Sequence, residues 1–363
     1  MMKKSLVHIP SLKEIKKNAP GVVVGIYQGK NTLLEHEIGF SNIMTSEPIS
    51  KNQHFRIGSL TKTVVTTVIL CLVDRGFFSL DDKVSSFFRD EARTWMRTLP
   101  KTLTILHLGN MTSGLFNYSE DATFQKAISD NPSIEWTAEE LLSFSLDGRN
   151  NHYFEPGLGW YYTNTNLILL GRIAEKVTGE TIESLCEELV FTPLKMKNSF
   201  AATSNEMPVP FSRGYMYGYA DGRAPTSVLR DVTNNSPSWA NAAGFCISTL
   251  GDLRTYIPAF VNGLLLSEKV LKQRNESFVQ LTFAEYGFGL HREEGRWYGH
   301  NGAIPGYQTF ASYCPQFDVT VLVLSNVQSE LSGINPSDTI GGEIVKAFEA
   351  AYEKDKSLHF QVL

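Results

Sequence analysis

The sequence predicts an α+β protein in which strands from both chain ends form one antiparallel sheet with flanking helices. Near the N-terminus, "VVVGIYQGK" and "TLLEHEIGF" are apolar, β-branched runs joined by a short turn, which is typical of a hairpin. Near the C-terminus, "GHNGAIPGYQTFASYC" and "VTVLVLSNV" form a second such pair. The chain between these pairs is mostly helical in pattern, so we expect an inserted, mostly helical subdomain.

The helical segments follow one another along the chain. The first begins at Ser59 and ends near Gly76, and the next four are "TILHLGNMTSG", "TAEELLSFSL", "NLILLGRIAEKVTG" and "TIESLCEELV". The amphipathic stretch "IGGEIVKAFEAAYEK" predicts a C-terminal helix. Because no linker or internal repeat divides the chain, we expect a single domain over residues 1–363. Its sheet-containing subdomain would comprise approximately residues 1–75 and 236–363, and its helical subdomain approximately residues 76–235.

Composition narrows the classes of partner and compartment. Hydrophobic residues make up 42% of the 363 residues, so the chain can bury a large core. The net charge is −5 and the basic residues are dispersed, which argues against nucleic acid as a partner. The longest apolar run, "VVTTVILCLV", is too short to span a membrane, and the N-terminus lacks the apolar region of a signal peptide. We therefore expect a soluble, cytoplasmic protein.

The cysteines and histidines do not form a pattern that would hold a metal. The four cysteines are far apart, and the eight histidines are scattered without a helical pair. We expect no disulfide framework, no metal and no organic cofactor.

The segment "FRIGSLTK" places Ser59 and Lys62 three residues apart at the predicted start of a helix. Residues at this spacing lie on one helix face, so the lysine amine would lie behind the serine hydroxyl. Lysine acts as a base only if its pKa is lowered, and the apolar continuation "VVTTVIL" would bury it. A Ser-x-x-Lys pair also arises by chance, so this motif is not decisive by itself.

Two further motifs would complete such a site. Tyr162-Thr163-Asn164 precedes a predicted helix, and a tyrosine that faces the Ser/Lys pair can relay protons. The structural alternative is an aromatic residue followed by an Asn N-cap. His300-Asn301-Gly302 lies on a predicted strand, where the alternative is an edge histidine beside a glycine that permits a bulge.

In this order, the three motifs resemble the Ser-x-x-Lys, Tyr-x-Asn and His-x-Gly motifs of the serine β-lactamase-like hydrolases. This superfamily includes penicillin-binding D-Ala-D-Ala carboxypeptidases, D-aminopeptidases, D-amino-acid amidases, class C β-lactamases and related esterases. The blocks "ILHLGNMTSGL" and "ANAAGFCISTLGDLRTY" are also similar to the family, so the resemblance extends from about Val22 to Asn326. It implies a β-lactamase-like fold.

The resemblance also implies a role for each motif residue. Ser59 would attack the substrate carbonyl and form an acyl-enzyme. Lys62 and Tyr162 would share the base and acid work, and Asn164 would hydrogen-bond Lys62 and the substrate amide. His300 would lie across the cleft, keep its field positive and assist Tyr162.

The third motif separates the branches of the superfamily. Class C β-lactamases have lysine at its first position, whereas His300 is similar to the peptidase and amidase branches. Asn301 and Ala303 stand where carboxypeptidases resemble one another in having threonines, and Arg292 lies one position later than their carboxylate-binding arginine. An amide substrate needs no carboxylate clamp, although Arg292 or Arg296 would still be within reach of the site.

These departures favour a D-stereospecific serine hydrolase that acts on amide or peptide bonds of small D-amino-acid derivatives. The alternatives are a carboxylesterase or acyltransferase of the same fold, or a penicillin-binding protein with little turnover. β-Lactams are expected as acylating inhibitors.

Aromatic residues would shape the substrate pocket. Those that border the cleft in relatives, or follow "MTSGL" here, are Tyr215, Tyr217, Tyr219, Trp239, Phe116 and Tyr118. They form either ordinary packing or an aromatic wall that selects D-Phe or D-Leu derivatives. The oxyanion hole would be the backbone N–H groups of Ser59 and Ala303. The expected oxyanion- and substrate-binding residues are Ser59, Ala303, Asn301, Gly302, Phe116 and Trp239.

Overall fold

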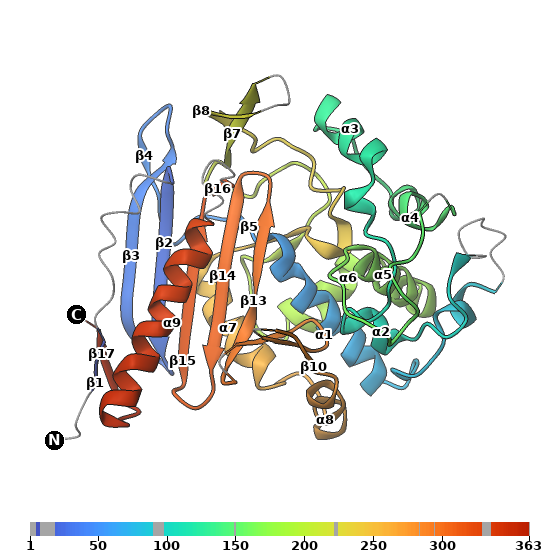
Figure 1. Ribbon diagram of the computed structural model, residues 1–363. Helices are drawn as coiled ribbons and strands as arrows, with labels where there is room; N and C mark the ends of the chain where they lie inside the picture. The colour runs from blue at the N-terminus through green and yellow to red at the C-terminus, as the bar shows by residue number, and fades with distance from the viewer. Residues whose placement is uncertain are drawn as a thin grey trace.

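The computed structural model describes residues 5–7, 19–89, 98–148, 150–220, 224–282, 284–293, 295–328 and 335–362. Within them, the largest element is a nine-stranded antiparallel sheet of order β10-β11-β12-β13-β14-β15-β2-β3-β4 (Figure 1). Its strands are β2 (Gly21–Gln28), β3 (Asn31–Asn42), β4 (Glu47–Pro48), β10 (Val279–Gln280), β11 (Glu285–Tyr286), β12 (His291–Glu293), β13 (Trp297–Ile304), β14 (Tyr307–Cys314) and β15 (Val319–Ser325). The N-terminal strand β2 pairs with the C-terminal strand β15, so the sheet joins both chain ends as predicted.

Side-chain alternation along the central strands divides the core between the two faces of the sheet. On β15, Val321 and Val323 pack in the same cluster as Ile344 of α9 (Pro336–Asp355). Leu322 and Leu324 point to the other face, whose cluster contains helix α7 (Leu250–Val261) and the helical part of the chain. Figure 1 shows α9 along one face of the sheet and the remaining helices beyond the other. The α+β prediction is therefore confirmed.

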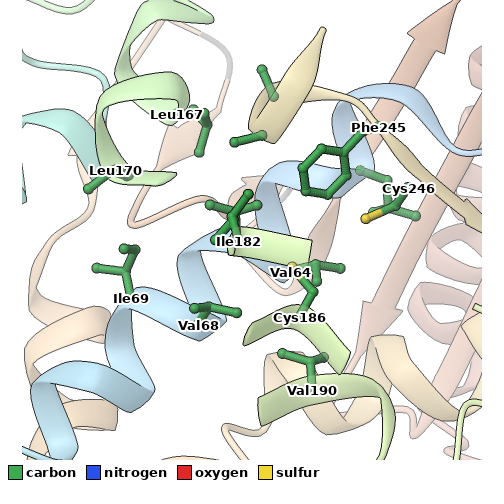
Figure 2. Packing of buried hydrophobic residues seen from close by; sticks show 14 of the residues in the cluster. Val64, Val68, Ile69, Leu167, Leu170, Ile182, Cys186, Val190, Phe245 and Cys246 are labelled. Atoms are coloured by element: carbon green, nitrogen blue, oxygen red, sulfur yellow. The ribbon is translucent and has the colours of Figure 1, made fainter. Parts of the chain in front are cut away.

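The helical part surrounds α1 (Thr61–Asp74), whose residues from Thr61 to Leu72 are all buried. A helix that is apolar on all sides belongs in a core, and Figure 2 shows its Val64, Val68 and Ile69 against the helices that cover it. The other helices are α2 (Ile105–Gly109), α3 (Ala122–Asp130), α4 (Ala138–Leu146), α5 (Thr165–Thr178), α6 (Ile182–Cys186) and α8 (Glu268–Glu276). All four cysteines are buried free thiols. The predicted subdomain boundaries stay predictions.

Small elements complete the fold. Two minor sheets have the orders β16-β7-β8 and β5-β9-β6, and β1 pairs with β17. The bounds of these strands are β1 (Ser5–Val7), β5 (Phe55–Arg56), β6 (Phe200–Ala201), β7 (Tyr215–Ala220), β8 (Ala224–Asp231), β9 (Cys246–Ser248), β16 (Val327–Gln328) and β17 (Phe360–Val362). The single-turn elements are η2 (Gly58–Leu60), η3 (Val84–Phe88), η5 (Tyr118–Glu120), the π-helical η6 (Glu187–Phe191) and η7 (Asn241–Ala243).

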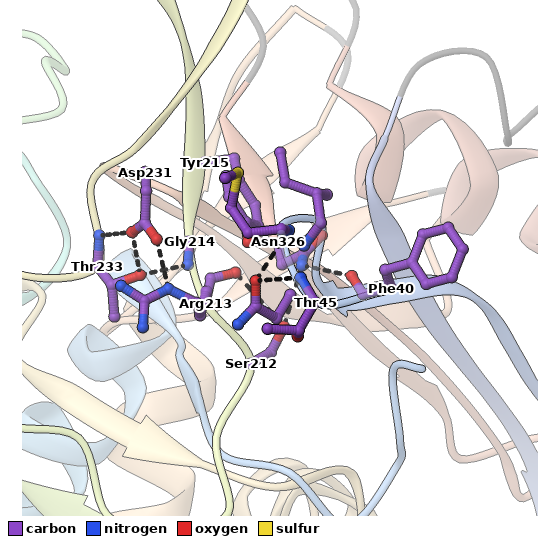
Figure 3. A network of polar contacts seen from close by, with 12 residues as sticks. Phe40, Thr45, Ser212, Arg213, Gly214, Tyr215, Asp231, Thr233 and Asn326 are labelled. Carbon is purple, nitrogen blue, oxygen red and sulfur yellow. Dashed lines mark hydrogen bonds and ion pairs between the residues drawn. The ribbon is translucent and has the colours of Figure 1, made fainter. Parts of the chain in front are cut away.

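A polar network anchors the base of the β7–β8 hairpin to the main sheet (Figure 3). The carboxylate of Asp231 accepts hydrogen bonds from Arg213 and from Thr233, whose Oγ1 in turn accepts from the backbone N–H of Gly214 at 2.9 Å. The Asn326 amide donates to the Phe40 carbonyl at 2.9 Å. The backbone N–H of Tyr215 on β7 donates to the Asn326 carbonyl at 3.0 Å, which ties the hairpin to the end of β15 and, through Asn326, to β3.

Several helices differ from the sequence prediction. The predicted helix in "TILHLGNMTSG" ends at Gly109, because the chain turns at Met111, whose φ is +63°. Helices α3, α7 and α8 were not predicted. In α7, Pro258 interrupts the helical pattern of the sequence. In α8, the sequence is so strongly charged that few apolar residues mark a helical period. Among the described residues, no helix has both the length and the apolar character needed to cross a membrane.

Candidate active site

Ser59 and Lys62 meet where η2 runs into α1. Ser59 lies in the 3₁₀ turn, and Lys62 lies one turn later in the first turn of α1. The Lys62 Nζ atom is 3.0 Å from the Oγ atom of Ser59 and donates a hydrogen bond of 3.0 Å to the carbonyl oxygen of Ala243. The serine is partly exposed, whereas the lysine side chain is completely buried. The predicted pair is therefore within hydrogen-bonding distance.

The surroundings of Lys62 make its amine a base. Burial lowers the pKa of Lys62 well below its usual value, because the ammonium form loses its hydration. The ring of Tyr162 lies 4.8 Å from Nζ and covers one side of it. A neutral amine at hydrogen-bonding distance from a hydroxyl can accept its proton, as a serine nucleophile requires.

Tyr162 presents a protonated phenol to the same site. Burial raises the pKa of Tyr162, and the neighbouring Ser59 hydroxyl opposes this shift only in part. The hydroxyl is buried without a hydrogen-bond partner of normal geometry among the described residues. The raised pKa keeps Tyr162 protonated, and a protonated phenol beside Ser59 can donate a proton.

Asn164 does not make the contact predicted for it. Its side-chain amide donates to the Oγ atom of Ser119 at 3.4 Å, and its backbone N–H donates to Asn117 at 3.1 Å. Lys62 instead uses the Ala243 carbonyl, which the fold brings from 181 residues away. The expected hydrogen bond between Asn164 and Lys62 is therefore wrong, and Asn164 lies at the start of α5 as its N-cap residue.

Strand β13 approaches the nucleophile through two glycines. A Cβ atom built on Gly302 would lie 1.9 Å from the Ile57 carbonyl oxygen, and one built on Gly58 would lie 2.7 Å from the backbone nitrogen of Ala303. Gly58 also has a φ of +51°, a conformation that favours glycine. The absence of side chains at both positions brings Ala303 beside the turn that carries Ser59, as the predicted oxyanion hole requires.

His300 lies beside Tyr162 but is hydrogen-bonded to another tyrosine. The ring centroids of Tyr162 and His300 are 6.0 Å apart, whereas the Tyr286 hydroxyl is 3.2 Å from His300 Nε2. Burial, followed by the proximity of His291 and Lys62, lowers the pKa of His300 well below its usual value. This shift favours the neutral imidazole and speaks against the predicted positive field from His300, which stays a prediction.

The side chain of Asn301 lies on the face of the sheet opposite His300. Successive residues of a strand point to opposite faces, and Asn301 is paired with Phe310, which packs in the same cluster as α9. His300 points toward Tyr162 instead. This placement does not favour a contact between the Asn301 side chain and a substrate near Ser59, and the role of Asn301 in substrate binding stays a prediction.

Two of the six residues of the predicted aromatic wall, Tyr118 and Tyr215, are part of the core. Tyr118 is fully buried and donates to the Trp239 carbonyl at 2.6 Å, and Tyr215 is buried with its hydroxyl bound to the backbone N–H of Ile43. Phe116 and Trp239 are half-buried, against Tyr153 and Phe124 respectively. Tyr217 is also half-buried, and the Tyr219 side chain lies outside the described part of the structure.

A different aromatic group surrounds the reactive residues. Tyr286 packs edge-on against Tyr162, His291 and Trp160, with centroid distances of 6.2, 4.7 and 5.7 Å. Trp160 also borders a shallow cavity of about 530 Å³, which Gln280, Leu281, Thr282 and Ala284 complete. Sequence reasoning missed Tyr286 and Trp160, although Trp160 lies only two residues before the tyrosine motif.

A carboxylate next to the tyrosine motif was also missed. Glu120 accepts hydrogen bonds from Tyr153 at 2.7 Å and from Tyr161 at 3.1 Å. The Asn117 amide donates to it at 3.0 Å, while the same amide group's oxygen accepts from the backbone N–H of Asn164. Glu120 is exposed, and Asn117 connects it to the start of α5, directly after the tyrosine motif.

Comparisons with known proteins identify the family of the chain. The Beta-lactamase family model matches residues 9–336. Penicillin-binding protein 4* of Bacillus subtilis (strain 168) is 27% identical over 84% of this chain and 67% of its own. The chain spans only 59% to 67% of the length of this and the next two curated relatives.

Two solved structures are similar over nearly the whole chain. A D-stereospecific amidohydrolase from Streptomyces sp. has a TM-score of 0.79 and 27% identity, covering 93% of this chain and 96% of its own. A D-amino acid amidase from Ochrobactrum anthropi SV3, complexed with L-phenylalanine amide, has a TM-score of 0.77 and 25% identity, covering 95% and 97%.

Proposed function

The chain belongs to the beta-lactamase family, and we propose that it is a D-stereospecific serine hydrolase that cleaves amides of D-amino acids through an acyl-enzyme. The observation that carries the proposal is the 3.0 Å contact between Ser59 Oγ and the buried Nζ of Lys62. It supplies a nucleophile and a neutral base in one helical turn. The similar D-stereospecific amidohydrolase and D-amino acid amidase support the substrate class.

In the acylation step, Lys62 accepts the proton of Ser59 as Oγ attacks the substrate carbonyl carbon. The backbone N–H groups of Ser59 and Ala303 hold the oxyanion that forms, and each such donor is typically worth about 10²–10³ in kcat. Tyr162 then donates its proton to the departing amine, which leaves as a neutral molecule.

In the deacylation step, water replaces the amine. The phenolate of Tyr162 accepts a proton from water, and the resulting hydroxide attacks the ester carbonyl. As the acid leaves, Lys62 returns its proton to Ser59 Oγ. Each group therefore ends the cycle in the protonation state in which it began.

The two arginines considered above as holders of a terminal carboxylate, Arg292 and Arg296, are already paired with carboxylates. Arg292 forms a bidentate ion pair with Glu285, and Arg296 lies 3.6 Å from Glu349. Position 291 itself carries a histidine whose pKa is lowered to about 4 by burial and by Lys62. This arrangement favours an amide over a substrate that ends in a free carboxylate.

Glu120 favours an amino-acid amide over a simple ester. Its carboxylate accepts hydrogen bonds from Tyr153, Tyr161 and Asn117. Asn117 also accepts a hydrogen bond from the backbone N–H of Asn164, at the start of α5. An exposed carboxylate at this position would pair with the α-ammonium group of the substrate. A simple ester has no such group.

The test is product release from matched D- and L-phenylalanine amides, with Ser59→Ala as the control. Serine-dependent release of ammonia from the D form alone would support the proposal. Turnover of p-nitrophenyl acetate without release from either amide would replace it with an esterase. Stable labelling by a fluorescent penicillin without turnover of any substrate would indicate a penicillin-binding protein instead.

A further inference from the structure

A buried hydrogen-bonded chain connects β11 to β13 beside the reactive residues. Tyr286 and His300 are 0% and 4% exposed. The Tyr286 hydroxyl lies 3.2 Å from His300 Nε2, and His300 Nδ1 lies 2.6 Å from the carbonyl oxygen of Asn301. Tyr286 has no role in the reaction steps above, yet its hydroxyl is the partner of Nε2, the ring nitrogen of His300 that is not bound to the backbone of β13.

The acceptor at Nδ1 determines the direction of both bonds. A carbonyl oxygen accepts hydrogen bonds and cannot donate them, so Nδ1 of His300 carries a proton. A neutral imidazole then has a lone pair on Nε2, and the Tyr286 hydroxyl must donate to it. This places one proton on Nδ1 and none on Nε2.

The groups that face His300 favour this neutral form. They are His291 from β12, at a ring-centroid distance of 4.7 Å, Lys62 from α1, Tyr162 before α5, and Tyr286 itself. None of them is a carboxylate that would stabilise an imidazolium. His291 also packs edge-on against Tyr286 at 4.7 Å, so it limits the movement of that ring.

We propose that Tyr286 is a positioning residue that holds His300 as the Nδ1-protonated tautomer and thereby fixes the β13 backbone opposite Ser59. His300 bonds to the carbonyl of Asn301, and the N–H of Ala303 lies two residues farther along the same strand. His300 Nε2 is engaged by Tyr286 and does not take the Tyr162 proton in the resting enzyme. Tyr286 thus acts on the reaction through the strand that carries the predicted oxyanion donor.

The first test is ¹⁵N NMR of the histidine side chains in the wild-type protein, with His300→Asn identifying the signals of His300. The expected result at pH 7 is a protonated Nδ1 and an unprotonated, hydrogen-bonded Nε2. A proton on Nε2 would overturn the proposal. This measurement uses no substrate, so it stays decisive even if the proposed amidase activity is not found.

The second test compares Tyr286→Phe with Tyr27→Phe. Tyr27 is also almost fully buried, and its hydroxyl donates to Glu35 at 3.0 Å, but it lies on β2 far from the site in the sheet order. In Tyr286→Phe, the Nε2 signal should move toward that of a free nitrogen, and kcat for D-phenylalanine amide should fall about tenfold or more with KM little changed. Tyr27→Phe should change neither quantity. An unchanged Nε2 signal, or a wild-type kcat despite a shifted signal, would overturn the proposal.

Discussion

Gly302 on β13 lies in direct backbone contact with Ile57, the residue before η2. A Cβ atom on Gly302 would lie 1.9 Å from the Ile57 carbonyl oxygen and 3.1 Å from the backbone nitrogen of Leu60. Both neighbours are main-chain atoms, which cannot rotate away as a side chain can. The glycine therefore sets the distance between the serine turn and the strand that carries Ala303.

Replacing this glycine tests the predicted oxyanion hole. In Gly302→Ala, the methyl group should push β13 away from η2 and misplace the Ala303 N–H. We expect kcat for D-phenylalanine amide to fall by roughly 100-fold, the usual effect of removing one oxyanion donor. Steady-state kinetics and thermal unfolding of the purified variant would measure both the catalytic and the structural cost.

Gly342→Ala is the matched control, because a Cβ at that position in α9 would meet nothing within 4 Å. It should raise stability by about 1 kcal/mol, since alanine is the better helix former, and leave kcat unchanged. If Gly302→Ala retained wild-type kcat, β13 would not supply the oxyanion donor.

Removing the lysine should separate activity from stability. In Lys62→Met, Ser59 loses its base, and kcat should fall by roughly 10²–10⁴. The variant should nevertheless melt higher, by about 2 °C or more, because an apolar side chain fits this fully buried position without desolvating an amine. Differential scanning calorimetry and amide hydrolysis by the same preparation would measure the two effects.

The size of this gain in stability depends on pH. The pKa of Lys62 is lower in the folded protein than in the unfolded chain, so the unfolded chain binds more protons below its usual value near 10.4. Stability linked to Lys62 is therefore present at high pH and is lost as pH falls toward its folded pKa. The advantage of Lys62→Met should shrink as pH rises toward about 10.4 and stay constant above it. An advantage that grew with pH would mean that the lysine is charged in the folded state.

The sequence predicted those parts of the site that depend on local spacing. The Ser59–Lys62 pair follows from helical geometry, and the place of Ala303 beside Ser59 was implied by the family resemblance of the His300-Asn301-Gly302 motif. The Tyr286–His300 bond could not be found in this way, because β12 lies between their strands and only sheet pairing brings them together. Similarly, the Ala243 carbonyl that binds Lys62 comes from a distant turn.

The aromatic residues show a second limit of sequence reasoning. Tyrosines such as Tyr118 and Tyr215 are common in substrate pockets. Here both are buried in the core, with their hydroxyls hydrogen-bonded to backbone groups. Residue type alone does not distinguish a pocket wall from a core. Both are lined by apolar side chains, and in both a tyrosine hydroxyl finds a hydrogen-bond partner.

Neutralising Glu120 should weaken recognition of the substrate's ammonium group. In Glu120→Gln, the hydrogen bonds to Tyr153, Tyr161 and Asn117 can largely be kept, but the negative charge is lost. We expect KM for D-phenylalanine amide to rise about tenfold, equivalent to one charge-assisted hydrogen bond. The rate for the same amide with an acetylated amino group should be slow in the wild type and unchanged in the variant.

Glu188→Gln is a suitable control, because Glu188 is 55% exposed in a surface ion pair with Arg75 on another part of the chain. Glu188→Gln should change neither KM for the free amide nor the rate for the acetylated amide. An equal loss in Glu120→Gln for the free and the acetylated amide would instead show that Glu120 only supports the loop around Tyr153 and Tyr161.

His291 should make the protein sensitive to acid. Burial, and secondly Lys62, lower the pKa of His291 from 6.5 in the unfolded chain to about 4 in the folded protein. Between these values the unfolded chain binds more protons, so the stability is fully present above about pH 6.5 and is lost as pH falls through about 4. At pH 4.5 the loss from this one group should be about 2 kcal/mol, an order-of-magnitude figure.

Urea unfolding of His291→Gln at pH 7.0, 5.5 and 4.5 would measure this contribution, because glutamine does not titrate. The variant should be less stable than the wild type at pH 7.0 through lost packing against Tyr286 and His300, but the difference should close as pH falls. His300 remains in both proteins, but His291 is one of the groups that lower its pKa, so the comparison measures His291 together with its effect on His300. His36→Gln, at an exposed position on β3, should follow the wild-type curve at every pH. Parallel curves for the wild type and His291→Gln would mean that His291 titrates alike in the folded and unfolded chains, and that it does not share the dry environment of His300.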